Sequence, residues 1–431
     1  MTSPVRIHIL TLGCPKNEVD SDRMRALVGS SAYRLVDDLD DADVAIVNTC
    51  AFIQEAVEES IDVVLDLTGE WRDGAPGRRI VVTGCMPSRY GDDLGEALTE
   101  ADALVPVAEE SALLATVERL TGVPAAAAAG STRTASGPSA YLQVSDGCFR
   151  RCTYCTIPGI RGPYRSAPLA ALVAEARMLA GDGAREIVLI GQDISAYGRD
   201  LDGPETLSDV IQAVCAIDEV AWVRLMYVQP DGATDELLDT MRSEPKVCHY
   251  LDMPLQHVSP HILRAMGRSG SAKEYLALVA RIRDALPGVV LRTSLIAGFP
   301  GETDAQVEEV VDFLGQAQLD YAGVFVYSPE DGTAAADMAG LPHTEVRIQR
   351  SNLVRATADD IGLEKAAQCV GRTLDVLVEG VDEDGTPVGR WRGQAPDIDG
   401  VVLLDRSATG GDIVRVRITD ALGYDLEGEI T

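Results

Sequence analysis

The sequence lacks any long apolar run and any basic segment, and these two absences exclude broad classes of protein. No stretch reaches the roughly 18 apolar residues of a membrane-spanning helix, so none is predicted. Residues 1–14 lead directly into a strand-like pattern, without the charged, apolar and small-residue zones of a signal peptide. We therefore expect a cytoplasmic protein, in whose reducing surroundings the nine cysteines remain thiols or metal ligands.

Basic residues are scarce along the whole chain. There are 68 acidic residues against 37 basic ones, and the segments 1–120, 121–370 and 371–431 each contribute to the net charge of -31. Proteins that bind nucleic acid usually present a basic face, because phosphate contacts supply much of their affinity. The composition favours a basic partner, and an acidic surface that serves only solubility is the alternative.

Composition changes divide the chain into three parts, as its length also suggests. Residues 121–140 are rich in Ala, Gly, Ser and Pro and are typical of an interdomain linker. After residue 368, short alternating stretches separated by Gly and Asp replace the earlier alternation of apolar runs and helix-like segments. We predict an α/β protein with an N-terminal parallel α/β domain at 1–120, a central domain at 141–368 and a small all-β barrel at 369–431.

Three apolar runs of the first domain each end in a cysteine. They are "IHILTLGC" at Cys14, "DVAIVNTC" at Cys50 and "RIVVTGC" at Cys85. Helix-like stretches between them predict a parallel sheet, whose strand carboxyl ends form the usual ligand crevice. We expect the three thiols to share one site at this edge. The alternative is that each is a free cysteine that packs well at a buried strand end.

The central domain repeats the alternation of strand and helix six times, which predicts an open, partial (β/α)6 barrel. Catalytic residues of such barrels lie at the carboxyl ends of the strands. Four residues fall at such ends: Cys148, Gln192, Gln256 and Gly298.

The stretch "CFRRCTYC" places three thiols close together, at Cys148, Cys152 and Cys155. A structural zinc site normally has four ligands, and no histidine lies nearby, so zinc is the weaker interpretation. A cubane iron-sulfur cluster held by three thiolates keeps one iron open to a substrate or cofactor. Nearby arginines either supply positive charge to an anionic cluster or form a solvated loop face: Arg150, Arg151, Arg161 and Arg165.

The same stretch resembles the CxxxCxxC signature of the radical S-adenosylmethionine (SAM) enzymes. With the N-terminal cysteines and a C-terminal TRAM-type barrel, nearly the whole chain is similar to the methylthiotransferases. The runs "LGCPKNEVDSDRM" and "LDMPLQH" resemble the branch that modifies the small-subunit ribosomal protein numbered twelve. The tRNA-modifying branch often has Gln-Met-Asn where this chain has Pro15, Lys16 and Asn17.

The resemblance implies two [4Fe-4S] clusters and SAM as cofactors. Cys148, Cys152 and Cys155 would hold the catalytic cluster, whose open iron binds SAM, and Cys14, Cys50 and Cys85 would hold a second cluster. The implied reaction adds a methylthio group to the β carbon of an aspartate in the ribosomal protein. Implied partners are that basic protein or the small ribosomal subunit, and an electron donor protein.

Further cofactor contacts are expected at Tyr154, Gln192, Arg292 and Ser294. Tyr154 would pack beside the adenine or only on the barrel wall. The other three are expected at strand ends, and each has the alternative of a hydrogen-bonded polar residue of the core.

Several other residues are expected to be structural. "GFPGET" lacks the lysine of a phosphate-binding loop and predicts a tight turn, with Thr303 as the cap of the next helix. Cys215, Cys248 and Cys369 have no partners at ligand spacing, and lone histidines such as His249 and His257 are more often satisfied core or surface residues. His257, at a strand end, keeps a substrate contact as its alternative.

Two other functions remain open from the sequence: methylthiolation of an adenosine in tRNA, and a non-catalytic cluster carrier. The carrier is disfavoured because it does not need a six-unit barrel with an open-iron loop. Direct tRNA binding is disfavoured because residues 371–431 hold 13 acidic and 6 basic residues.

Overall fold

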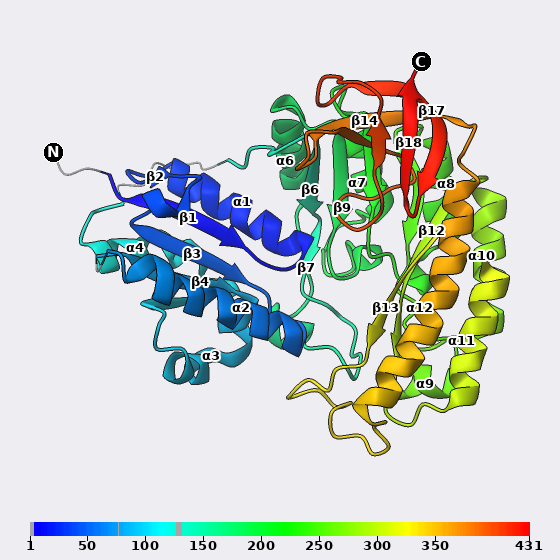
Figure 1. Ribbon diagram of the computed structural model, residues 1–431, viewed down its shortest axis with the longest axis horizontal. Coiled ribbons are helices and arrows are strands. Elements are labelled where there is room, and N and C mark those ends of the chain that lie inside the picture. Colours follow the sequence, from blue (N-terminus) through cyan, green and yellow to red (C-terminus); the bar gives the residue numbers. More distant parts are fainter. Residues whose placement is uncertain (1–3, 76, 126–131) are drawn as a thin grey trace. The chain divides into compact units, whose positions relative to one another are not determined.

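The computed structural model describes residues 4–75, 77–125 and 132–431, and these form two compact units (Figure 1). The first unit comprises residues 1–134, 146–151 and 155–165, and the second comprises 135–145, 152–154 and 166–431.

The first unit is built on a five-stranded parallel sheet in the order β2-β1-β3-β4-β5. Its strands are β1 (Arg6–Thr11), β2 (Arg34–Leu35), β3 (Val44–Thr49), β4 (Arg79–Gly84) and β5 (Ala103–Pro106). Every residue of the central β3 is buried, as is usual for parallel strands covered on both faces. The strand order reverses between β1 and β3, which is the point where open α/β sheets bind their ligands.

Helices cover both faces of this sheet. Met24 and Val28 of α1 (Pro15–Gly29) pack with α4 (Leu113–Thr121) on one face, and α2 (Gln54–Asp66) and α3 (Cys85–Ala97) pack on the other. Pro15 is the first residue of α1, where its missing N–H costs nothing. The remaining short elements are η1 (Leu39–Asp41), η2 (Leu67–Arg72), η3 (Val107–Ala112) and α5 (Ile157–Ile160). The predicted N-terminal parallel α/β fold is confirmed.

The second unit contains a six-stranded parallel sheet in the order β6-β9-β10-β11-β12-β13. Its strands are β6 (Ser139–Gln143), β9 (Glu186–Ile190), β10 (Trp222–Leu225), β11 (Val247–Asp252), β12 (Val290–Ala297) and β13 (Tyr321–Val326). These are the six strands expected from the apolar runs, so the partial (β/α)6 barrel is confirmed. Two short strands, β7 (Ser145–Asp146) and β8 (Arg165–Ser166), follow β6 in the chain.

Helices line the outer side of the barrel sheet, and Figure 1 shows α10, α11 and α12 beside one another along β12 and β13. The helices are α6 (Leu169–Gly181), α7 (Leu207–Cys215), α8 (Asp235–Ser243), α9 (Pro260–Ala265), α10 (Ala272–Ala285), α11 (Asp304–Ala317) and α12 (Thr344–Ala367), with short turns η4 (Ile194–Ala196) and η5 (Pro230–Gly232). Thr303 caps α11 in a capping box with Gln306, as predicted.

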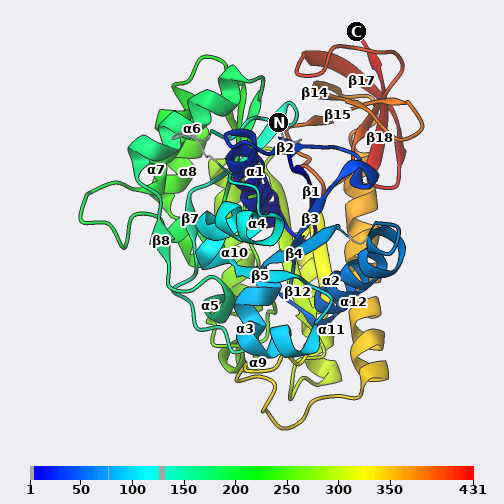
Figure 2. The ribbon, with the colours of Figure 1, turned by 90° about the vertical axis from the view of Figure 1, so that its left-hand side faces the viewer.

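The last strands close into a five-stranded barrel in the order β14-β15-β16-β18-β17, which confirms the predicted small all-β domain. They are β14 (Thr373–Val381), β15 (Pro387–Trp391), β16 (Val402–Leu404), β17 (Ile413–Leu422) and β18 (Asp425–Ile430). Figure 2 shows this barrel beyond the end of α12, with the C-terminus on it.

A buried ion network fastens the small barrel to the amino-terminal end of the parallel sheet. Glu186 of β9 accepts from Arg224 Nε at 2.7 Å and from Arg390 Nη2 of β15 at 2.6 Å, and all three side chains are essentially inaccessible. The loop between β15 and β16 adds Asp399, whose carboxylate accepts from the Tyr250 hydroxyl at 2.7 Å. The loop therefore covers the amino ends of β9, β10 and β11.

The expected linker at 121–140 is only partly described, since residues 126–131 lie outside the described residues. Its first part belongs to the first unit, where the Ala125 carbonyl accepts from the Ala32 N–H at 2.7 Å. No helix in the described part of the chain is long and apolar enough to cross a membrane.

Candidate functional site

The three N-terminal cysteines lie at the carboxyl ends of three neighbouring strands. Cys14 follows β1 and precedes α1, Cys50 follows β3 directly, and Cys85 follows β4 and is the first residue of α3. β1 and β3 flank the reversal of strand order, so Cys14 and Cys50 stand on either side of the ligand crevice of this fold. As expected, the three cysteines lie at the same edge of the sheet.

Glycines before two of these cysteines allow the close approach of the loops. Gly13 has φ +103°, and a Cβ there would lie 2.6 Å from Cys50 Cβ. Gly84 has φ +93°, and a Cβ there would lie 2.8 Å or less from backbone atoms of Thr49. Both conformations favour glycine. The repeated Gly-Cys pair is therefore a local signal for loops that pack tightly at the sheet edge.

Two buried amides join the Cys14 loop to the end of β3. Asn17 Nδ2 donates to Asn48 Oδ1 at 3.2 Å and to the Thr49 carbonyl at 3.0 Å, and Asn48 Nδ2 donates to the Asn17 carbonyl at 2.8 Å. Asn17 Oδ1 also accepts from the Cys14 thiol at 3.2 Å. Sequence reasoning gave neither asparagine a role in holding the cysteines, because partners 31 residues apart leave no local pattern.

A buried arginine adjoins the third cysteine. Arg161 Nη2 donates to Cys85 Sγ at 3.5 Å, and its Nη1 lies 2.7 Å from Asp20 Oδ2. Burial raises the pKa of the Cys85 thiol to about 11, and the Arg161 charge opposes that rise. Burial also raises the pKa of the Cys50 thiol. Both thiols therefore hold their protons at neutral pH and release them when a metal binds.

The donor set suits an iron-sulfur cluster. In the described ranges, no three His, Cys, Asp or Glu side chains converge as ligands of a single metal ion do. In a cubane cluster each thiolate binds a different iron, so the sulfurs stay apart. Thiolates are also the ligands that such clusters prefer. Three thiols on separate strand ends, near one cationic donor, fit such a group.

The second set of cysteines lies on the irregular segment after β7. Cys148 and Cys155 belong to the first unit and Cys152 to the second, and all three are partly exposed. The Arg150 N–H donates to Cys148 Sγ at 3.3 Å. Arg151 and Arg165 are exposed, as the solvated-face alternative expects.

Arg268 is a cationic neighbour of Cys152 that the sequence did not indicate. Its Nη1 donates to Cys152 Sγ at 3.8 Å, and its Nη2 donates to Gln229 Oε1 at 2.7 Å and to the Pro254 carbonyl at 2.8 Å. Gln229 and Pro254 follow β10 and β11, so Arg268 ties Cys152 to the carboxyl end of the barrel sheet.

Two predicted cofactor contacts lie near this carboxyl end. Tyr154 packs against the apolar cluster that contains Phe299 and Tyr327, and a contact with the adenine stays a prediction. Gln192 is half-buried and lies two residues beyond β9.

The expected position of Arg292 and Ser294 at a strand end is wrong. They are the third and fifth residues of β12, which continues to Ala297 because the apolar run extends to that point. Arg292 Nη1 lies 3.3 Å from Asp252 Oδ1, and its Nε lies 3.5 Å from Asp399 Oδ1. Its guanidinium is thus held by two carboxylates.

Strained backbone marks the carboxyl ends of two barrel strands. Tyr227 and Gln256 have φ +63° and +70°, which non-glycine residues seldom adopt outside functional sites or turns. His257, beside Gln256, is buried, and its Nδ1 accepts the N–H groups of Val258 and Ser259 at 2.9 Å. His257 is thus a buried, hydrogen-bonded residue, as expected of a lone histidine, and a substrate contact stays an untested alternative.

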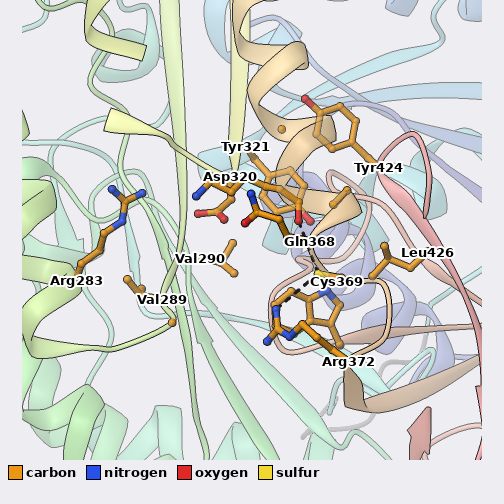
Figure 3. Close-up of a pocket in the computed structure, with 15 residues that line it drawn as sticks. Arg283, Val289, Val290, Asp320, Tyr321, Gln368, Cys369, Arg372, Tyr424 and Leu426 are labelled. Carbon is orange, nitrogen blue, oxygen red and sulfur yellow. Dashed lines mark hydrogen bonds between the residues drawn. The ribbon is translucent and has the colours of Figure 1, made fainter. Parts of the chain in front are cut away.

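A separate cavity of about 290 Å³ lies at the amino ends of β12 and β13, between the end of α12 and the small barrel (Figure 3). Asp320, Tyr321, Cys369 and Trp391 are among its lining residues. Arg283 caps α11 by donating to the carbonyls of Ala317 and Gln318. Because chemistry in such barrels occurs at the opposite strand ends, this cavity is not the candidate active site.

Models of three protein families match successive parts of the chain. The uncharacterized protein family UPF0004 matches residues 6–106, the radical SAM superfamily matches 142–314 and the TRAM domain matches 370–431. Among solved structures, the radical SAM methyltransferase TsrM of Kitasatospora setae has a TM-score of 0.56 and 15% identity, covering 87% of this chain and 81% of its own. At that identity the likeness shows the fold alone.

Relatives match over the full length. The ribosomal protein uS12 methylthiotransferase of Geobacter sulfurreducens is 43% identical over 440 residues, which cover 99% of this chain and 98% of the relative. Its namesake from Lachnoclostridium phytofermentans is 37% identical, with coverages of 98% and 99%. At this identity and coverage, the chain belongs to the uS12 methylthiotransferase family of radical SAM enzymes.

Proposed function

We propose that this chain is a radical SAM enzyme that transfers a methylthio group to ribosomal protein uS12, at the β carbon of an aspartate. The observation that carries the proposal is full-length similarity to relatives named for that activity, at 43% identity. The relatives reported above are named for a ribosomal protein and not for tRNA, so the tRNA alternative is not favoured.

The catalytic cysteines are proposed to be Cys148, Cys152 and Cys155. When bound there, an iron-sulfur cluster supplies the electron that splits SAM into methionine and a radical able to remove hydrogen from an unactivated carbon. Arg268 holds Cys152 by its hydrogen bond and places a positive charge beside that sulfur. A positive charge at this position would stabilise an anionic cluster held by the three sulfurs.

A second cluster is proposed at Cys14, Cys50 and Cys85. Support comes from their placement at adjoining strand ends, the close packing of Gly13 on Cys50, and the cation beside Cys85. Cys14 and Cys85 also stand at the N-termini of α1 and α3, where the helix dipole favours an anionic group such as a cluster.

SAM is proposed to contact Tyr154, Gln192 and Ser294. Tyr154 and Gln192 follow Cys152 and β9 at the carboxyl end of the sheet. Ser294 alternates with the buried Thr293 and Leu295, so it lies on the other face of β12 from the helices. Arg292 lies on the same face, and its contact with SAM stays a prediction. Its alternative role is the ion pairing with Asp252 and Asp399.

The partner of the small barrel is proposed to be the basic substrate protein or the small ribosomal subunit. The loop between β14 and β15 carries Asp382, Glu383 and Asp384, all exposed. Such a surface attracts Lys- and Arg-rich protein and repels a phosphate backbone. We further propose a cytoplasmic location, an electron donor protein as second partner, and the division into domains at 1–120, 141–368 and 369–431 described above.

Mass spectrometry of cells that lack the gene tests the proposed substrate. Ribosomal protein uS12 should lose one methylthio group, while tRNA should keep its modifications. Purified, reconstituted protein should restore the group on uS12 and release 5'-deoxyadenosine when given SAM and reductant. Loss of a methylthio group from tRNA alone would reject the proposal in favour of the tRNA alternative, and absence of 5'-deoxyadenosine would favour the cluster carrier.

A further inference from the structure

We propose that Arg161 is a positioning residue of the second cluster, which orients Cys85 and, together with Asp20, sets the reduction potential of that cluster. The inference rests on the proposed function, in which Cys85 is a cluster ligand. Arg161 lies outside both cysteine sets, six residues beyond Cys155, and has so far been described only as a cation beside Cys85.

The chain around Arg161 fixes its guanidinium in place. Ile160, the last residue of α5, is buried in the apolar core formed by α2, α3 and the sheet of the first unit. Thr156 Oγ1, at the start of α5, donates to the Phe52 carbonyl at 3.2 Å, two residues after Cys50. The side chain of Arg161 is 2% exposed, so it cannot turn to solvent without disturbing this core.

The charged side chains around Arg161 lie at different distances from its guanidinium. Asp20 Oδ2 lies 2.7 Å from Nη1, whereas Asp146 Oδ1 lies 3.9 Å away and is partly exposed. Glu110 also interacts electrostatically with Arg161, and Arg23 Nη1 lies 3.7 Å from Asp20 Oδ1. A buried guanidinium needs such compensation, because an unpaired buried charge costs several kcal/mol. Asp20 compensates the charge and leaves Nη2 directed at Cys85 Sγ.

Charges next to a cluster ligand change the free energy of its oxidised and reduced forms by different amounts. Reduction adds negative charge, which a buried cation stabilises and a buried anion destabilises. Hydrogen bonds to ligating sulfur act in the same direction as the cation. Arg161 should therefore raise the reduction potential of the second cluster, and Asp20 should moderate that effect.

Substitutions on the two sides of this ion pair should shift the potential in opposite directions. Arg161→Gln removes the cation and should lower the potential. Asp20→Asn removes the anion at nearly constant volume and should raise it. Arg161→Lys keeps the charge and should stay closer to the wild type than Arg161→Gln. A role confined to packing would reduce stability in both variants and leave the potential of the remaining cluster unchanged.

The measurement uses the full-length chain with Cys148, Cys152 and Cys155 replaced by serine, so that only the second cluster contributes. After anaerobic loading with iron and sulfide, the electron paramagnetic resonance signal of the reduced cluster is followed against applied potential. Arg165→Gln, which removes an exposed arginine of the same segment, is the matched control and should not shift the curve.

The possible outcomes distinguish a failure of this inference from a failure of the proposed second cluster on which it rests. A background protein that binds no cluster would reject Cys14, Cys50 and Cys85 as ligands, and this inference with them. A loaded cluster whose potential in the Arg161→Gln and Asp20→Asn variants equals that of the control would overturn the role of Arg161 alone. Asp20→Asn keeps the test decisive if Arg161→Gln does not fold.

Discussion

At the scale of single residues, the most costly change should occur at Glu186. Two arginines pair with this buried carboxylate, so Glu186→Gln leaves Arg224 and Arg390 partly uncompensated and should lower the free energy of unfolding by about 3 kcal/mol. Chemical denaturation followed by tryptophan fluorescence measures the loss, since Trp222 and Trp391 lie in this unit. Asp239→Asn, at an exposed ion pair with Arg242, should cost about 0.5 kcal/mol or less.

The ionisation of Glu186 should also make the stability of the folded protein depend on pH. Burial by itself would raise its pKa, but the attraction of Arg224 and Arg390 outweighs burial and lowers the pKa from 4.5 to about 2. A lowered pKa stabilises the folded state above the unfolded value of 4.5, and that stabilisation disappears as the pH falls toward 2. Wild type should therefore lose stability more steeply than Glu186→Gln across this interval. Parallel curves would show that the carboxylate is not paired in solution.

The amide pair at the sheet edge permits a second residue-scale prediction. Asn48→Ala leaves the buried Nδ2 of Asn17 without the Asn48 oxygen and the Asn17 carbonyl without its donor. We expect a loss of about 1–3 kcal/mol in stability and a lower iron content in the first unit, because the Cys14 loop is released. Iron assay after reconstitution checks this, with the exposed Asn352→Ala as control. Unchanged iron would separate the amide pair from the metal site.

At the scale of elements, strands with continuous apolar runs could be predicted and long-range side-chain pairs could not. The runs that end at Cys14, Cys50 and Cys85 identified β1, β3 and β4, because parallel strands buried on both faces have few polar residues. The end of β12 near Gly298 was predicted correctly, but Arg292 and Ser294, expected at a strand end, lie inside the strand as less buried residues that alternate with buried ones.

The cationic neighbours of the cysteines show why part of the candidate site could not be predicted. Arg161 was considered with the loop arginines, yet its contact with Cys85 joins residues 76 apart. Arg268 reaches Cys152 across 116 residues. Sequence spacing can identify ligands that lie on one loop. Arg161 and Arg268 approach their cysteines only in the folded chain, so spacing cannot identify them.

The acidic loop of the small barrel carries a prediction about association. Neutralising Asp382, Glu383 and Asp384 together should slow association with free uS12 or small subunits at low salt, because the loop attracts basic protein. The difference should shrink at higher salt, where exposed charges are screened within about 10 Å at 0.1 M. Stopped-flow or surface-binding kinetics measure the rate.

A variant with the same charge change elsewhere is the control for that experiment. Glu55, Glu58 and Glu59 are exposed on α2 of the first unit, and their replacement by glutamine should affect the rate less. Equal slowing by both variants would assign the effect to net charge, and tighter binding of wild type to tRNA than to uS12 would restore the tRNA alternative.

At the scale of the whole molecule, two sets of three cysteines predict two cubane clusters. Anaerobic reconstitution should give near eight iron and eight sulfide per chain, as two four-iron clusters require. Replacing Cys14, Cys50 and Cys85 by alanine should halve both counts and leave reductive cleavage of SAM intact, because the catalytic cysteines remain. Loss of cleavage with the catalytic cluster still present would show that the two sets do not have separate roles.

The loop that covers the amino ends of the barrel strands has a consequence for synthesis on the ribosome. Glu186 and Arg224 are synthesised before Arg390 and Asp399, which lie further along the chain. Until those residues are made, the amino ends of the barrel strands stay exposed, and Glu186 is paired with Arg224 alone. A fragment that ends at a premature stop codon near residue 370 would keep these strand ends uncovered. Such a fragment should be bound by chaperones and degraded by proteases.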